Sequence, residues 1–140
     1  MVPKSAENFR SLCTDNTNNL SYKGTTFHSV INGFRLAGGD VKEGDGSQGE
    51  SIYGSSFNDE NLNLKHHKRG MLTMNNTGPD TNNSQFLVTF GETPWLDGYH
   101  VVVGELVEGE EVLREVETIG TRDGKAKEVI KIENCGEVRI

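Results

Sequence analysis

The feature that most constrains the fold is the density of turn-forming residues, which leaves room only for short regular elements. The 140 residues include 17 glycines but only 3 prolines, and asparagine gathers in "TDNTNN" and "MNNTGPDTNNSQ". These residues favour turns and irregular loops between strands. With 33% hydrophobic residues the core must be thin, but the length suffices for one domain, residues 1–140. We therefore expect a single, mainly β domain.

Strands are expected where β-branched and aromatic residues gather between turn signals. These segments are 25–31, 34–41, 70–76, 84–90, 99–106 and 128–140. The first two, separated at Asn32-Gly33, are expected to be neighbours in the sheet. Two segments with apolar residues at helical spacing, 3–13 and 108–120, predict helices. Few apolar residues occur in 42–63, which predicts a long ordered loop.

The charge balance argues against two classes of partner. The formal net charge is −7, whereas nucleic acids and anionic membranes attract clustered Lys and Arg. The basic cluster 65–69 is short and is expected to be a solvated loop. No apolar run approaches the ~20 residues of a membrane-spanning helix and no signal peptide is visible, so an intracellular, cytoplasmic location is expected. Cys13 and Cys135 match no metal or redox spacing and are expected to be buried thiols.

Common motifs for metal binding, nucleotide binding and hydrolysis find no support. Residues 44–49 match G-x-G-x-x-G, but no helix follows, so they predict a tight loop. His66 and His67 are adjacent and point to opposite sides of an extended chain, which disfavours a shared metal. His28 is expected to be a hydrogen-bonded core or flank residue of a strand. No G-x-S-x-G motif supports a hydrolase, and no metal site is expected.

The segment "TPWLDGYH" is the best candidate for a binding surface. It places Trp95, Leu96 and His100 between turn signals, where loop residues can line a groove. An apolar pocket with a polar rim fits this pattern. The alternative is that Trp95 fills the core, and composition alone does not separate the two.

Five stretches, in order along the chain, share a further pattern. They are "VPKSAENFRSLCT", "YKGTTFHSVINGFRLAGGD", "GESIYGSSFNDENLNLKH", "GMLTMNNTGPDTNNSQFLVTF" and "WLDGYHVVVGELVEGEEVL". Together they resemble the cyclophilins, the peptidyl-prolyl cis-trans isomerases, over nearly the whole chain. The resemblance implies an antiparallel β-barrel of eight strands capped by two helices. It also implies a reaction that turns X-Pro bonds with neither a nucleophile nor a cofactor.

The resemblance assigns a peptide-binding groove to residues spread along the chain. It implies that Phe34 is the pocket aromatic and that Asn76 holds the peptide backbone. Met74, in the strand before Asn76, has the residue type that the family has there. The other implied contacts are Gln85, Trp95, Leu96 and His100. The implied partners are proline-containing peptide or protein clients.

Five positions depart from the family pattern, and two of them, Ser29 and Ala37, are those of the catalytic pair. Ser29 stands where the family has its catalytic arginine, and Ala37 stands where the family has a glutamine that helps to orient it. Loss of a charged transition-state donor commonly lowers the rate by about 10²–10³, so strongly reduced isomerase activity is expected. Asn75 replaces a small alanine and Leu87 replaces a phenylalanine, which alters the shape of the groove.

Arg35 offers a replacement for the missing cation. It follows Phe34, at a position where the family usually has an uncharged residue that lines the same groove. One hypothesis is that its long side chain reaches the prolyl nitrogen from the neighbouring strand. The alternative is that Arg35 extends into solvent or pairs with an acidic residue.

Three functions share this expected fold and stay open at this point. The first is a slow peptidyl-prolyl isomerase. The second is a module that binds proline-containing segments without turning them over, and the third is a scaffold subunit of a larger assembly. The resemblance also implies cyclosporin binding through Trp95, and Ser29, Asn75 and Leu87 argue against it.

The start of the chain differs from the family as well. The family has two barrel strands before its first helix, whereas this chain begins at "MVPKSAENF". Missing strands would leave unpaired sheet edges and an uncovered core. We therefore expect either a fragment of a longer protein, or a partner chain, swapped protomer or rearrangement that covers the gap.

Overall fold

A computed structural model describes residues 2–14 and 19–138, and within these ranges the strands form one five-stranded antiparallel sheet. The strand order is β1-β2-β4-β3-β5, and every pairing is antiparallel. The strands are β1 (Ser29–Ile31), β2 (Arg35–Gly38), β3 (Met71–Met74), β4 (Phe86–Thr89) and β5 (Val102–Glu105). Each is shorter than its predicted segment. The mainly β architecture and the pairing of the first two strands are confirmed.

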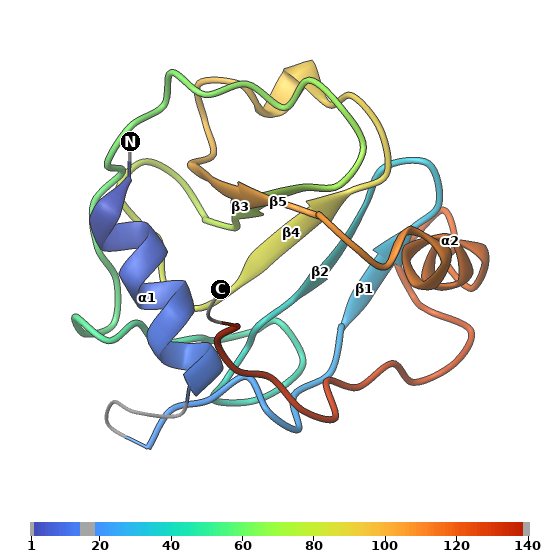
Figure 1. Cartoon of the computed structure of the whole chain (residues 1–140), viewed down its shortest axis with the longest axis horizontal. Helices are drawn as coiled ribbons and strands as arrows, with labels where there is room; N and C mark the ends of the chain where they lie inside the picture. The colour runs from blue at the N-terminus through green and yellow to red at the C-terminus, as the bar shows by residue number, and fades with distance from the viewer. Residues whose placement is uncertain (1, 15–18, 139–140) are drawn as a thin grey trace.

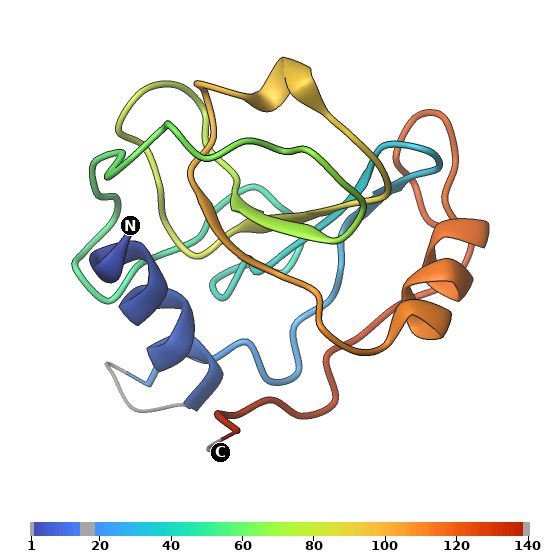
Figure 2. The ribbon, with the colours of Figure 1, turned by 45° about the horizontal axis from the view of Figure 1, so that its top comes forward.

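Two helices lie on either side of this sheet (Figure 1). Helix α1 (Pro3–Thr14) contacts β5, and helix α2 (Glu110–Thr118) contacts β1 and β2. Pro3 opens α1 without leaving an N–H unpaired, and acidic residues in the first turn of α2 interact favourably with the helix dipole. Both predicted helices are confirmed. A short 3-10 helix, η1 (Pro94–Leu96), lies at the periphery in both views and was not predicted (Figures 1 and 2).

Two clusters of buried side chains attach the helices to the sheet. Beside α1, the rings of Phe9, Tyr22 and Phe86 pack with centroids 5.1 to 5.4 Å apart. The Tyr22 hydroxyl donates a 2.7 Å hydrogen bond to the Ser84 carbonyl, which satisfies the polar end of a completely buried ring. The second cluster, beside α2, consists of Val30, Leu36, Phe90 and Leu113.

The predicted C-terminal strand is wrong over residues 128–138; the last two residues of the prediction lie outside the described ranges. The segment runs beside residues 24–27 and shares only a few backbone hydrogen bonds with them, such as the 2.9 Å bond from the Ile132 N–H to the Thr25 carbonyl. Ile130 and Ile132 nevertheless pack against the two clusters. The alternating pattern therefore predicted which side chains turn inward, but not the lack of a continuous ladder.

The loop 42–63 contains no regular helix or strand, as predicted, and its first part is organised by one carboxylate. Asp40 is 1% exposed, and its oxygens accept hydrogen bonds of 2.9 to 3.1 Å from backbone N–H groups. The donors are Lys42, Glu43, Gly46 and Gln48. Burial acts to raise the pKa of Asp40, but these hydrogen bonds outweigh it and hold the pKa below its usual value.

Gly46 shows why this loop is rich in glycine. Its φ is 91°, a left-handed conformation that favours glycine, and a Cβ here would collide with the ring of His28. The ring lies half-buried, and burial lowers the pKa of His28. Its Nδ1 has no hydrogen-bond partner among the described residues, so the expected hydrogen bond is not found at that atom.

The two cysteines differ from expectation in their degree of burial. Cys13 and Cys135 are free thiols, but they are half-buried, and both pack against the aromatic cluster beside α1. Burial raises the pKa of Cys13 to about 11, so this thiol is protonated at neutral pH. Within the described ranges, no helix has the length and apolar character needed to cross a membrane.

We predict that Asp40→Asn lowers the free energy of unfolding by roughly 2–3 kcal/mol at pH 7, because an amide replaces one of two accepting oxygens. Asp45→Asn, which changes an exposed aspartate of the same loop, should shift it by less than about 0.5 kcal/mol. Folding lowers the pKa of Asp40, so its contribution is present above the usual value of 3.8 and is lost as pH falls below it. Urea unfolding at several pH values measures both effects, and equal losses in the two variants at pH 7 would contradict this role.

Candidate functional site

One face of the sheet brings together site residues that the sequence places in separate segments. Ser29 on β1 lies opposite Ala37 on β2, and Ala37 lies opposite Leu87 on β4. Directly paired residues, and residues two apart on one strand, point to the same face of a sheet. Ser29, Arg35, Ala37 and Leu87 therefore share a face.

The guanidinium of Arg35 lies beside Ser29 on this face. Its Nη1 donates a 2.9 Å hydrogen bond to the Ser29 Oγ, and its Cζ lies 5.1 Å from the centroid of the Phe34 ring. Among the described residues, no carboxylate forms an ion pair with Arg35, which is half-buried. Burial lowers the pKa of Arg35, but an arginine stays charged at neutral pH.

Next to this cation lies an apolar floor. The floor is formed by Ala37 and Leu87, which are buried; the buried Leu96 and the half-buried Phe34 pack against it. The side chains come from β2, β4 and η1, so the floor depends on three elements that are distant in the sequence. A small apolar group is the kind of ligand that an apolar surface of this type favours.

Trp95 forms an exposed wall beside the floor. Its side chain is 58% exposed, and its ring centroid lies 5.5 Å from that of Phe34 at an interplanar angle of 50°. The alternative that Trp95 fills the core is therefore wrong. We refer to Trp95 and Leu96, both on η1, as the Trp wall.

A group of amides and a histidine lies near the ends of β3 and β4. The Gln85 Nε2 donates to the carbonyls of Gly46 and Gln48, which ties β4 to the loop organised by Asp40. The Asn76 Nδ2 donates a 2.8 Å hydrogen bond to the Tyr99 carbonyl. The His100 Nδ1 lies 2.8 Å from the Met74 carbonyl. A carbonyl only accepts, so this nitrogen carries the proton.

A hollow of about 60 Å³ separates some of these polar groups, and Asn75 lines it. Its lining consists of Gly46, Asn75, Asn76, Thr77, Thr81, Asn83 and Gln85. Amide and hydroxyl groups dominate this list, so the hollow favours polar groups over apolar ones.

Met74 does not contact this face, which corrects its assignment to the groove. Its side chain is 0% exposed and packs with Val2, Phe57 and Val101. The reason is strand alternation: Thr73 lies opposite Leu87, so the next residue along β3 points to the other side. Met74 supports the sheet from its core face.

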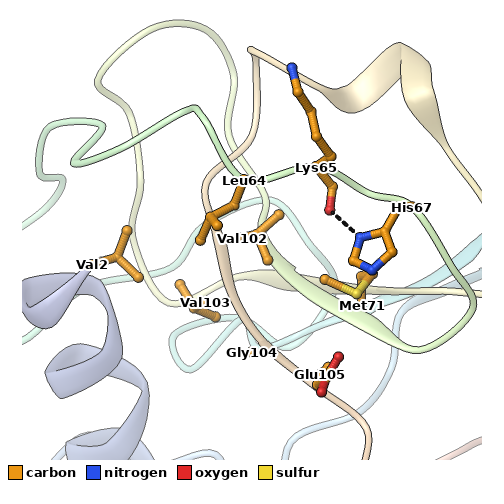
Figure 3. Close-up of a pocket in the computed structure, with 9 residues that line it drawn as sticks. All are labelled: Val2, Leu64, Lys65, His67, Met71, Val102, Val103, Gly104 and Glu105. Carbon is orange, nitrogen blue, oxygen red and sulfur yellow. Dashed lines mark hydrogen bonds between the residues drawn. The ribbon is translucent and has the colours of Figure 1, made fainter.

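A larger apolar hollow lies elsewhere, beside the outer edge of β5 (Figure 3). Its volume is about 260 Å³, and it is lined by Val2, Leu64, Lys65, His67, Met71, Val102, Val103, Gly104 and Glu105. None of the site residues predicted from the sequence is among them. The candidate site is therefore the sheet face with Arg35, and not the larger hollow.

Sequence reasoning missed several residues that shape the site. Asp40 lacks a motif of its own, and η1 is too short to show helical periodicity. His66 was expected to be part of a solvated loop with its neighbours, yet it is 1% exposed while His67 is exposed, as their opposite orientations require. No group of three metal-binding side chains occurs in the described part of the chain.

A family model described as cyclophilin type peptidyl-prolyl cis-trans isomerase/CLD matches residues 1–137. The chain belongs to the cyclophilin family. The match confirms the resemblance found in the sequence, and it supports peptidyl-prolyl isomerase function and the binding of proline-containing peptides. The five-stranded antiparallel sheet with two helices is consistent with a cyclophilin-like fold.

We predict that Trp95→Ala weakens binding of a proline-containing peptide by about tenfold, because an exposed aromatic wall supplies contact area to the ligand. The free energy of unfolding should change by less than about 0.5 kcal/mol, since the side chain is mostly exposed. Tyr99→Ala, which removes a neighbouring aromatic that is 71% exposed, is the matched control. Peptide titration followed by NMR measures the affinities, and equal affinities for wild type and Trp95→Ala would contradict this assignment.

Proposed function

We propose that this cyclophilin isomerises X-Pro bonds slowly, with Arg35 as its cation in place of the arginine that the family has at the position of Ser29. The observation that carries the proposal is the 2.9 Å hydrogen bond from the Arg35 Nη1 to the Ser29 Oγ. It holds a guanidinium at the position from which the family's arginine extends. Phe34, Leu96 and Trp95 lie next to it as the proline-binding surface.

The reaction explains why a cation matters. Rotation about a peptide bond meets a barrier of about 18–20 kcal/mol, because the C–N bond has partial double-bond character. In the twisted transition state the prolyl nitrogen regains its lone pair and can accept a hydrogen bond. A guanidinium that donates to this nitrogen stabilises the transition state more than the planar ground state, and this difference accelerates the rotation.

The register of the strands explains how Arg35 can substitute. Ser29 lies opposite Ala37, and Arg35 is two residues before Ala37 on the same strand. Diagonal neighbours of this kind are within reach of long side chains. The Ser29 hydroxyl then accepts the hydrogen bond that fixes the guanidinium.

The same geometry supports slow turnover. At position 37 the family's glutamine, which orients the arginine, is replaced by an alanine that has no donor or acceptor on its side chain. A cation that approaches from the adjacent strand and has fewer orienting partners is less well organised for the transition state. We expect activity well below that of a cyclophilin that keeps both residues.

A proline-peptide binding module is the second candidate function. Ser29 and Ala37 remove both members of the family's catalytic pair, while Phe34, Trp95 and Leu96 still form an apolar surface. Such a module would bind the same clients and leave the X-Pro bond unchanged. A scaffold subunit, by contrast, would bind its partner without using Trp95.

Several finer proposals follow from the site. Cyclosporin should bind weakly, because Ser29, Asn75 and Leu87 change the groove in which it would lie. Among the described residues β5 is an edge strand of the sheet, and with the apolar hollow beside it (Figure 3) it is a suitable surface for a strand of a partner chain. A single domain and a cytoplasmic location stay predictions from the sequence.

We predict that Arg35→Ala lowers the rate of X-Pro exchange by about 10²–10³, the usual effect of removing a transition-state donor, and changes peptide affinity by less than about threefold. Ser29→Ala, which removes only the accepting hydroxyl, should lower the rate by about fivefold to tenfold. NMR exchange measurements on a short X-Pro peptide report binding and turnover together.

Arg122→Ala, which removes an exposed arginine, is the control for the change in net charge. Unchanged exchange in a folded Arg35→Ala variant would contradict the role of Arg35. Peptide shifts without accelerated exchange in the wild type, together with exchange that appears in Ser29→Arg, would establish the binding module instead.

A further inference from the structure

His66 is a buried link between η1 and the rest of the fold. It is 1% exposed although it lies in a basic segment. Its backbone N–H donates a 2.7 Å hydrogen bond to the Asp97 Oδ1, and its carbonyl accepts a 3.1 Å hydrogen bond from the Thr93 N–H. Thr93 precedes η1 and Asp97 follows it. One residue therefore fixes both ends of the helix that carries the Trp wall.

The ring of His66 extends this link to the sheet. Its Nδ1 lies 2.8 Å from the Asp97 Oδ1, and its Nε2 lies 2.9 Å from the Thr73 Oγ1 on β3. A carboxylate only accepts, so Nδ1 carries a proton. Burial lowers the pKa of His66, although Asp97 acts to raise it. Nε2 of the neutral ring is then an acceptor for the Thr73 hydroxyl, whose one proton is shared between Nε2 and the Val101 carbonyl.

The far end of the link reaches the apolar floor. Thr73 is 0% exposed and lies opposite Leu87 in the pairing of β3 with β4. Leu87 in turn packs against Leu96 of the Trp wall. The chain of contacts from Asp97 through His66 to Thr73 therefore ends beside Leu87 on the same face of the sheet, and it joins the floor to the wall.

Asp97, His66 and Thr73, joined by hydrogen bonds, have the residue types of a catalytic triad with an acid, a base and a nucleophile. Burial excludes a catalytic role for them. Thr73 and His66 have almost no exposed surface, so neither side chain is accessible to a peptide on the exposed face. The Thr73 Oγ1 is also 3.1 Å from the Val101 carbonyl, so its proton has acceptors within the protein. The arrangement is suited to holding elements in place.

We propose that His66 is a positioning residue that sets the distance between the Trp wall and the floor formed by Ala37 and Leu87. This inference rests on the proposed function in taking that surface as the proline-binding site. His66 acts through Asp97 and Thr73 and does not touch the peptide. Its loss loosens the wall, and this weakens ground-state and transition-state binding equally.

Three variants test the proposal. His66→Asn keeps an amide near the place of Nδ1 and loses the bond to Thr73. Thr73→Val removes this bond, together with the contact to the Val101 carbonyl, with a side chain of nearly equal size, and so it tests the link even if the histidine variant fails to fold. His67→Gln changes the adjacent, exposed histidine and is the matched control.

Two readouts separate this inference from the proposed function. Trp95 is the only tryptophan in the chain, so acrylamide quenching of fluorescence reports the order of the wall without any turnover. Exchange kinetics on an X-Pro peptide give KM and kcat. In His66→Asn and Thr73→Val we expect a higher quenching constant and a KM raised on the order of tenfold, the effect of losing about one buried hydrogen bond, with kcat within about twofold. His67→Gln should match the wild type.

Unchanged quenching in folded variants would overturn the proposal, because the wall would then not depend on the link. Changed quenching with unchanged KM and unchanged peptide affinity would also overturn it, and would show that the peptide does not use the wall. A fall in kcat at constant KM would assign these residues to the transition state instead. If the wild type binds the peptide without turnover, the dissociation constant replaces KM, so failure of the isomerase proposal stays distinguishable.

Discussion

The register of β2 between β1 and β4 is the constraint on which the site depends. It sets Ser29 opposite Ala37 and Ala37 opposite Leu87, and so it gives the cation and the apolar floor a common face. A shift of one residue would send Arg35 into the core and Leu36 into solvent, because side chains alternate along a strand. Burial of Leu36 beside α2 therefore stabilises the register that exposes the site.

The loops are held to this sheet by buried polar groups. The Asp40 carboxylate gathers the N–H groups of its loop, and Gln85 connects that loop to β4. His66 does the same for η1. Such groups compensate for a thin hydrophobic core, since a satisfied buried hydrogen bond fixes geometry and an unsatisfied one is costly. The loops beside the candidate site are thus joined to the strands by specific hydrogen bonds.

Hydrophobic patterns were enough to predict the positions of most strands and of both helices. They did not predict which side chains are buried in each element, since Leu113 is the buried residue of α2 and Val112 is exposed. They failed at 128–138, where the alternation is present but the backbone pairs only in places. Family resemblance located Phe34, Trp95 and the missing arginine. It could not show that Arg35 turns to Ser29, because an uncharged family residue at this position carries no information about a guanidinium. It also assigned Met74 to the groove, although strand alternation directs that side chain to the core.

The central question is whether a cation supplied from β2 meets the prolyl nitrogen. The most direct measurement is a crystal structure of the chain with a bound X-Pro peptide. We predict that the proline ring lies on Leu87 and Leu96 beside Trp95, and that the Arg35 guanidinium faces the X-Pro bond on the side of the prolyl nitrogen, where it can donate once the bond twists. A bound peptide with the Arg35 guanidinium turned to solvent or paired with a carboxylate would contradict the proposed mechanism.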